Sequence, residues 1–238
     1  MKNKKDTSPQ VSQGTKLYNT LDIKPFQWTE RQKEFIQLAT HKDTKIIMVS
    51  GPAGSAKTLL ATFAALTLIS QKRISDIIYV RSAVESADSK LGYLPGEVKD
   101  KMSYYGVPFF DKMEELLPKN DINTLIKDNR ISIVPVNYVR GLSWNARCII
   151  VDEAQNLTEK ELITVMTRIG KFSKCYVLAD PMQSDINGKS GGFSRISKLF
   201  DDKESKEMGI HYFEFKNEDI LRSDLVKFLV TKFTELKK

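Results

Sequence analysis

The stretch VSGPAGSAKTLLA, residues 49–61, follows the pattern G-x-x-x-x-G-K-[ST] at every position but one. Gly51, Lys57 and Thr58 stand where the pattern needs them, whereas Ala56 replaces the glycine that normally precedes the lysine. The apolar run KIIMVS (45–50) predicts a strand before the loop, and TLLATFAALTLI (58–69) predicts a helix after it. A loop between a strand and a helix is the context in which this pattern binds phosphate groups.

The predicted loop has the chemistry to bind ATP together with Mg²⁺. Backbone N–H groups would surround the phosphates, and the N-terminus of the helix adds a positive dipole. Lys57 would reach the β- and γ-phosphates, and the Thr58 hydroxyl would ligate Mg²⁺. The nucleotide-binding residues predicted from this loop are Gly51, Pro52, Ala53, Gly54, Ser55, Ala56, Lys57, Thr58 and Leu59.

Ala56 is the departure from the pattern that needs an explanation. The phosphate needs the backbone N–H of this residue, and alanine provides it. A glycine would be required only for a positive φ or for close contact with the nucleotide. We expect residue 56 to begin the helix with a negative φ, so we expect the alanine to be tolerated. The alternative is a Gly/Ala-rich turn before an unrelated helix.

A second motif, RCIIVDEAQN (147–156), is an apolar strand that ends in two carboxylates. At the carboxyl end of a strand beside the loop, Asp152 could hold Mg²⁺ through its waters. Glu153 could then orient or deprotonate the attacking water. Such a pair is common by itself, but after a phosphate loop it indicates an ATPase or a GTPase.

The remaining pattern predicts an α/β fold. Short apolar runs recur as DIIYV, ISIVPV, CIIVDE, CYVLAD and IHYFEF, as expected for parallel strands that are buried on both faces. Helical patterns lie between several of them, and capping boxes at Thr29/Gln32 and Thr158/Glu161 mark two helix starts. We expect the second of these helices to end at Gly170. Strands that alternate with helices indicate a doubly wound domain.

The amino-acid composition limits the classes of protein to which this chain can belong. The chain has 238 residues, of which 41% are hydrophobic and 28% charged, as in soluble globular proteins. The net charge of +7 favours polyanionic partners such as nucleic acid. Cys148 and Cys175 lie in apolar runs and are interpreted as small buried side chains. No apolar signal core or membrane-length run is visible, so we expect a cytoplasmic protein without membrane contact.

Several long blocks resemble the PhoH-like family of phosphate-starvation-inducible ATPases. They are VRSAVESADSKLGYLPGEVKDKM, YVRGLSWNARCIIVDEAQN, TRIGKFSKCYVLADPMQSDI and EDILRSDLVKFLV, and they occur in the family's order. The resemblance implies one RecA-like P-loop NTPase domain with a mostly parallel central sheet flanked by helices, related to superfamily-one helicases. It also implies assembly as a hexameric ring, in bacteria or bacteriophages. We assign residues 24–238 to this domain and interpret residues 1–23 as a flexible basic tail.

The resemblance also implies roles for single residues. Gln32 resembles the adenine-reading glutamine of helicase-like ATPases, although it could simply cap the helix. Gln183 resembles the residue that senses the γ-phosphate, in a block where Ala179 replaces the usual glycine. Arg222 matches a C-terminal arginine that could neutralise the transferring phosphate, from its own chain or from a neighbour. The predicted catalytic residues are Lys57, Glu153, Gln183 and Arg222, and the predicted metal ligands are Thr58 and Asp152.

The sequence signals for contacts with nucleic acid are less specific than those for the nucleotide site. Arg81 and Arg140–Gly141 lie in family blocks, where each could contact phosphate or pair with an acid. An aromatic segment interleaved with lysines could stack on bases, or it could form a small packed subdomain; it comprises Tyr93, Tyr104, Tyr105, Phe109 and Phe110 with Lys90, Lys99 and Lys101.

The leading functional hypothesis is an Mg²⁺-dependent ATPase coupled to binding or remodelling of nucleic acid, RNA more than DNA. The alternative is a nucleotide-gated binding or regulatory protein with little hydrolysis, which the two glycine-to-alanine changes motivate. Some relatives carry a fused PIN nuclease domain, but this chain has no residues left to build one. A kinase is disfavoured, because the DEAQ stretch and Gln183 resemble helicase motifs and a kinase needs an acceptor pocket and a lid.

Overall fold

The apolar runs predicted as strands form one parallel six-stranded sheet. The computed structural model describes residues 21–82, 98–183 and 192–220, together with residues 225, 228, 229 and 232. The order of the strands across the sheet is β3-β2-β4-β5-β1-β6, and every neighbouring pair is parallel. The predicted α/β class is therefore confirmed. The strands are β1 (Ile46–Ser50), β2 (Asp76–Arg81), β3 (Ile131–Pro135), β4 (Arg147–Asp152), β5 (Lys174–Ala179) and β6 (Ile210–Glu214).

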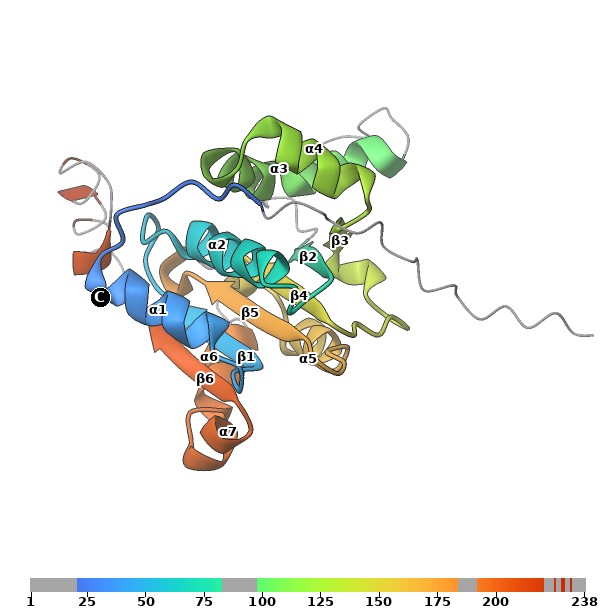
Figure 1. Cartoon of the computed structure of the whole chain (residues 1–238). Coiled ribbons are helices and arrows are strands. Elements are labelled where there is room, and N and C mark those ends of the chain that lie inside the picture. Colours follow the sequence, from blue (N-terminus) through green and yellow to red (C-terminus); the bar gives the residue numbers. More distant parts are fainter. Residues whose placement is uncertain are drawn as a thin grey trace, which may run out of the picture.

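Helices cover both faces of the sheet (Figure 1). One face packs against four of them: α1 (Glu30–Thr40), α2 (Lys57–Ser70), α3 (Val98–Leu116) and α4 (Lys119–Lys127). The other face packs against α5 (Glu159–Met166) and α6 (Gly192–Leu199), while the short α7 (Lys203–Glu207) contacts β6 near the edge. None of the described helices is long and apolar enough to cross a membrane.

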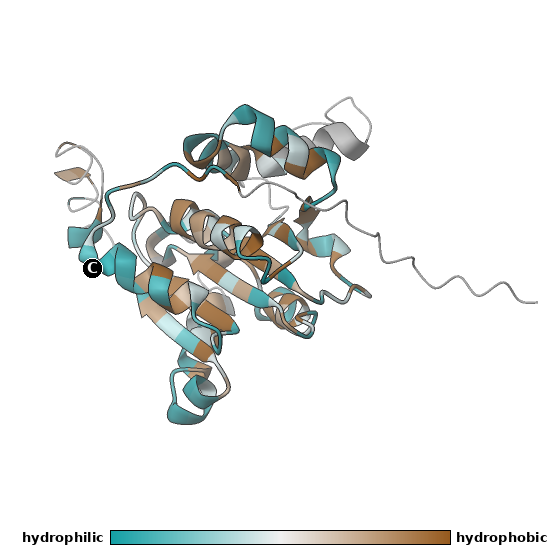
Figure 2. Cartoon of the chain, in the orientation of Figure 1, coloured by the Kyte–Doolittle hydropathy of each residue, from teal (hydrophilic) through white to brown (hydrophobic). Residues whose placement is uncertain are grey.

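Side chains along each strand alternate between the two faces. In β2, Ile77 and Tyr79 point toward α2 and α3, whereas Ile78 and Val80 join the core under α5 and α6. Both sets are buried, which is why these strands are apolar throughout instead of alternating with polar residues. Figure 2 shows the hydrophobic residues gathered in the sheet and on the inward sides of the helices. Cys148 and Cys175 lie in this core, as predicted.

The ends of the helices agree in part with the sequence pattern. Both predicted capping boxes are present, at Thr29/Gln32 for α1 and at Thr158/Glu161 for α5. The expectation that Gly170 ends α5 was wrong, because the helix ends at Met166. The Gly170 N–H instead donates to the Trp144 carbonyl at 2.7 Å, and a Cβ on residue 170 would lie 2.6 Å from that same oxygen. Glycine is needed there for a close approach of two backbones.

The strand order brings the two sequence motifs to one edge of the sheet. β5 lies between β1, which precedes the loop, and β4, which ends in Asp152. Because the carboxyl ends of parallel strands meet at the same edge, the loop, the two carboxylates and the turn after β5 converge there. That turn is the 3₁₀ helix η3 (Pro181–Gln183), and Glu153 is followed by η2 (Ala154–Asn156).

Candidate nucleotide site

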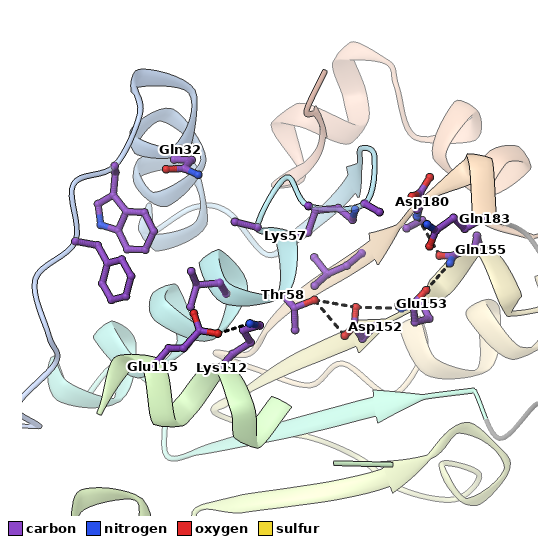
Figure 3. Close-up of a pocket in the computed structure, with 18 of the residues that line it drawn as sticks. Gln32, Lys57, Thr58, Lys112, Glu115, Asp152, Glu153, Gln155, Asp180 and Gln183 are labelled. Atoms are coloured by element: carbon purple, nitrogen blue, oxygen red, sulfur yellow. Dashed lines mark hydrogen bonds and ion pairs between the residues drawn. The ribbon is translucent and has the colours of Figure 1, made fainter. Parts of the chain in front are cut away.

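A pocket of about 640 Å³ lies at this edge (Figure 3). Its walls are formed by the loop after β1, the ends of β4 and β5, part of α3 and the chain around the start of α1. Most of the predicted site residues line it together, namely Gln32, Ala53, Gly54, Ala56, Lys57, Thr58, Leu59, Asp152, Glu153 and Gln183. In Figure 3, Gln32 and Glu115 lie toward one end, and Glu153 and Gln183 lie toward the other. We call these the base end and the phosphate end.

The remaining loop residues hold the loop in shape. A Cβ on Gly51 would lie 2.7 Å from the Phe215 Cβ, so a larger residue would displace the strand-to-loop junction. Ser55 is fully buried, and its hydroxyl donates to the Pro52 carbonyl at 2.8 Å. The Lys57 Nζ donates to the carbonyls of Gly51 and Pro52 at 2.8 and 2.9 Å. The lysine is therefore held inside the curve of its own loop.

The prediction about the backbone of Ala56 was wrong. We expected a negative φ, but the residue has φ 62° and ψ 22°, in the left-handed region. For a residue with a Cβ this conformation costs roughly 1–2 kcal/mol, and only glycine adopts it readily. The glycine of the pattern is therefore needed for backbone conformation. The helix still starts here, because the Ala56 carbonyl accepts the Leu60 N–H at 2.9 Å. Ala56 therefore adopts the backbone conformation that suits the pattern's glycine, and it does so with strain.

The two predicted metal ligands contact each other. The Thr58 hydroxyl donates to the Asp152 carboxylate, 3.2 Å from either oxygen. Asp152 also accepts the Glu153 N–H at 3.1 Å on Oδ1 and the Tyr79 hydroxyl at 2.7 Å on Oδ2. Burial, followed by the negative charge of Asp152, raises the pKa of Tyr79 well above its ordinary value, so the phenol keeps its proton.

This donor set fits Mg²⁺. No group of three or more His, Cys, Asp or Glu side chains that could hold a metal occurs in the described part of the chain. One hydroxyl and one carboxylate are hard oxygen donors, and Mg²⁺ is commonly bound by one or two such protein groups while waters and substrate phosphates complete its shell. Thr58 and Asp152 would hold the ion on this basis.

Glu153 is oriented by a residue that our sequence reasoning did not assign. Its backbone has φ 53°, which turns the chain sharply after β4. Its carboxylate accepts a hydrogen bond from the Gln155 Nε2, and the Gln155 Oε1 accepts the Asp180 N–H at 3.0 Å. Gln155 thus links Glu153 to the turn that carries Gln183. The DEAQ stretch contained this residue, but no pattern indicated which partner it would have.

Lys57 interacts with the acidic groups of the phosphate end. Burial lowers the pKa of Lys57 below its usual value, and the carboxylates of Asp180, Asp152 and Glu153 oppose that shift. An ammonium group among three carboxylates and the loop carbonyls is placed to neutralise anionic oxygens that enter the same space.

Gln32 caps α1, and its predicted adenine-reading role stays a prediction. Its side chain is fully buried, and its Oε1 accepts the Thr29 N–H at 3.0 Å in the capping box. Its Nε2 has no hydrogen-bond partner among the described residues. A buried amide N–H₂ without a partner costs free energy, which a ligand with an acceptor atom would recover. Capping therefore uses the oxygen, whereas the nitrogen is buried in a residue that lines the pocket.

The rest of the base end was not predicted. Phe26 and Trp28 line the pocket, with their rings stacked 4.9 Å apart and 15° from parallel, and Trp28 contacts Phe63 edge-on. Their position just before the Thr29 capping box was the only available signal. Lys112 and Glu115 reach the pocket from α3 as an ion pair. Nothing in the sequence near them indicated a role.

Several other predicted residues are either outside the described part of the chain or line another pocket. Arg222, most of residues 1–23 and the side chains of Lys90, Tyr93, Lys99, Lys101 and Tyr104 are outside the described residues. Phe109 is fully buried, stacked on Tyr79, which favours the packed-subdomain interpretation for that residue. Arg140 lines a separate pocket of about 330 Å³ together with Val136, Asn137, Thr158, Lys160, Glu161 and Thr164.

The amino-acid sequence of the chain is similar to those of known proteins that share one family description. The family model described as PhoH-like protein matches residues 23–234. A PhoH-like protein of Synechocystis sp. is 32% identical over 206 residues, which are 86% of this chain and 61% of the relative. One of Bacillus subtilis is 31% identical over 206 residues, or 62% of its length. The chain thus spans about three fifths of the length of these curated relatives.

Among solved structures, a chain from a study of DNA unwinding at forked DNA by two coordinating Pif1 helicases is similar. It is 16% identical with a TM-score of 0.37, and the match covers 80% of this chain and 44% of that one. A likeness of this size carries no argument about function.

Proposed function

We propose that this chain, which belongs to the PhoH-like protein family, binds ATP with Mg²⁺ and hydrolyses it in the cytoplasm, coupled to the binding or remodelling of nucleic acid. One observation carries the proposal. The Thr58–Asp152 contact, the partly buried Lys57 and the Glu153 carboxylate share one end of a pocket. Its other end holds two stacked aromatic rings and the Gln32 amide, whose nitrogen has no hydrogen-bond partner among the described residues.

Each residue of the phosphate end would have a different role in hydrolysis. Lys57 would neutralise charge on the β- and γ-phosphates, and the N–H groups of the loop would hold their oxygens. Mg²⁺, held by Thr58 and Asp152, would supply charge stabilisation for the leaving phosphate oxygens. Glu153 would accept the proton of the attacking water, with its carboxylate aimed by Gln155. Gln183, exposed at the same end, would contact the γ-phosphate.

The base end favours adenine. The Gln32 Nε2 can donate to a ring nitrogen, and the remaining lone pair of its Oε1 can accept from an exocyclic amino group. Adenine offers both groups on one edge, whereas guanine presents two acceptors there. Phe26 and Trp28 would stack on the base, a contact worth about 1–3 kcal/mol in nucleic-acid sites.

The pocket around Arg140 is the surface that we propose for nucleic acid. Arg140 and Lys160 are both exposed, and Tyr138, at the end of η1 (Val136–Tyr138), is 71% exposed beside them. A guanidinium and an ammonium beside an accessible ring can hold phosphates and stack a base. This pocket adjoins the start of α5, six residues after Glu153, so an occupant could influence the catalytic carboxylate.

A steady-state ATPase assay with and without RNA and DNA tests the proposal. We expect turnover that requires Mg²⁺ and rises with single-stranded RNA more than with DNA. The double variant Arg140→Ala/Lys160→Ala should lose this stimulation and keep basal turnover. The control Lys203→Ala/Lys206→Ala removes the same charge from α7 and should stay stimulated. Equal stimulation of both variants would exclude the Arg140 pocket.

The strained Ala56 supports a second candidate, a nucleotide-gated binding protein with little hydrolysis. The steady-state ATPase assay distinguishes this candidate from an active ATPase. Tight binding of ATP and Mg²⁺ with no turnover under any nucleic-acid condition would favour the gated protein.

We also propose that Arg222 completes the site of a neighbouring subunit in a hexameric ring. The phosphate end holds three carboxylates that interact with Lys57, so a further positive charge would stabilise the charge that develops at the γ-phosphate. Mixing Lys57→Ala subunits with Arg222→Ala subunits should restore hydrolysis that neither variant has alone. Mixed oligomers without restored hydrolysis would mean that Arg222 acts within its own chain or is structural.

A further inference from the structure

Tyr79 reaches the metal carboxylate from a neighbouring strand. Its Cα lies opposite Ile150 in the β2–β4 register, so Asp152 is its diagonal neighbour on the same face of the sheet. The Tyr79 side chain is fully buried, and its hydroxyl donates to the Asp152 Oδ2 at 2.7 Å. The ring is stacked on Phe109 of α3, with centroids 5.0 Å apart and 26° between the planes. The ring of Tyr79 is thus fixed by its stack on Phe109, and its hydroxyl is fixed by the hydrogen bond to Asp152.

The contacts of Asp152 show what this hydrogen bond contributes. The Thr58 hydroxyl lies 3.2 Å from both carboxylate oxygens and therefore does not distinguish between them. The Glu153 N–H fixes Oδ1 at 3.1 Å, and the Tyr79 hydroxyl fixes Oδ2 at the shorter distance of 2.7 Å. Without Tyr79 the carboxylate could rotate about its Cβ–Cγ bond and lose the orientation in which it faces Thr58.

We propose that Tyr79 is a positioning residue for the Mg²⁺ carboxylate, and that α3 holds it in place through Phe109. The inference rests on the proposed function, because it assigns the carboxylate to Mg²⁺. α3 then contributes to the pocket twice, directly through Lys112 and Glu115 at the base end and indirectly through Tyr79 at the phosphate end. Groups beyond the metal ligands commonly tune metal affinity in this way.

The test is a titration of Mg²⁺ in the presence of a fluorescent ATP analogue. Tyr79→Phe keeps the ring and its stack and removes only the hydroxyl. We expect the Mg²⁺ concentration for half-maximal binding to rise about tenfold, since a hydrogen bond to a charged group is lost. Affinity for the analogue without Mg²⁺ should stay within about twofold.

Tyr176→Phe is the matched control. Tyr176 is also fully buried, and its hydroxyl donates at 2.8 Å to the Ala39 carbonyl, at the C-terminal end of α1. Each variant loses the buried hydrogen bonds of one phenol, which for Tyr176 include a contact with Cys148, so thermal stability should fall in both. Only Tyr79→Phe should change the Mg²⁺ requirement. An unchanged requirement, or an equal change in both variants, would overturn the positioning role. A parent protein that fails to bind the analogue with Mg²⁺ would overturn the proposed function and this inference with it.

Discussion

The two ends of the nucleotide pocket are built in different ways. The phosphate end comes from a short loop and from the ends of two strands, all held by backbone hydrogen bonds at one edge of the sheet. The base end comes from the chain before α1 and from one side of α3, segments far apart in the sequence. Changes at the phosphate end should therefore alter chemistry and metal use, whereas changes at the base end should alter nucleotide affinity alone.

The largest effect is expected from Glu153→Gln. Removal of a general base typically costs 10²–10⁴-fold in turnover, while Thr58 and Asp152 still hold the metal, so ATP binding should be kept. Phosphate release and equilibrium binding measure the two effects. Glu159→Gln is the control and should behave as the parent, because Glu159 is a partly exposed glutamate on α5 that pairs with Arg195 outside the pocket. Normal turnover in Glu153→Gln would move the base to another residue.

Lys57→Ala should weaken binding of ATP with Mg²⁺ by about 10- to 100-fold, as expected for the loss of charged hydrogen bonds to phosphate. It also removes an ammonium group that interacts with the carboxylates of Asp180, Asp152 and Glu153. Isothermal titration calorimetry measures the affinity. Lys33→Ala removes an exposed lysine from α1 and should bind ATP normally. Equal affinities in the two variants would show that the loop does not hold phosphate.

Trp28→Ala tests the base end. We expect KM for ATP to rise about tenfold with kcat nearly unchanged, because stacking acts on ground state and transition state alike. Phe172→Ala removes a ring that is 84% exposed, outside the pocket, and should change neither constant. A fall in kcat with unchanged KM would contradict the division between the two ends.

The smallest effect concerns the two alanines that replace expected glycines. Ala56→Gly should raise the free energy of unfolding by about 0.5–1 kcal/mol, since relief of the left-handed strain exceeds the entropy cost of glycine. Ala179→Gly should lower it by about 0.5–1 kcal/mol, because Ala179 ends the regular strand β5. Urea denaturation measures both. Destabilisation by Ala56→Gly would show that the strain is offset elsewhere.

Much of the phosphate end could be predicted, because its signals are local. An apolar run, a loop with fixed spacing and a helical pattern predict strand, loop and helix in turn, and the DE pair follows its own strand directly. Parallel strands place their carboxyl ends together, so the meeting of Thr58 with Asp152 followed from the fold class. The capping role of Gln32 was also predicted, and the structure shows that its oxygen makes the capping contact while its nitrogen has no hydrogen-bond partner among the described residues.

Backbone conformation and packing between distant segments were decided by the tertiary structure. The φ of Ala56 depends on how the loop closes onto α2, and the need for Gly170 depends on the approach of Trp144. Tyr79 looked like any apolar strand residue until the register of β2 against β4 brought its hydroxyl to Asp152. Lys112 and Glu115 enter the pocket only because α3 packs beside α2. A periodic pattern specifies which side of an element is buried, but its partner is set by how the elements pack, and that depends on the whole core.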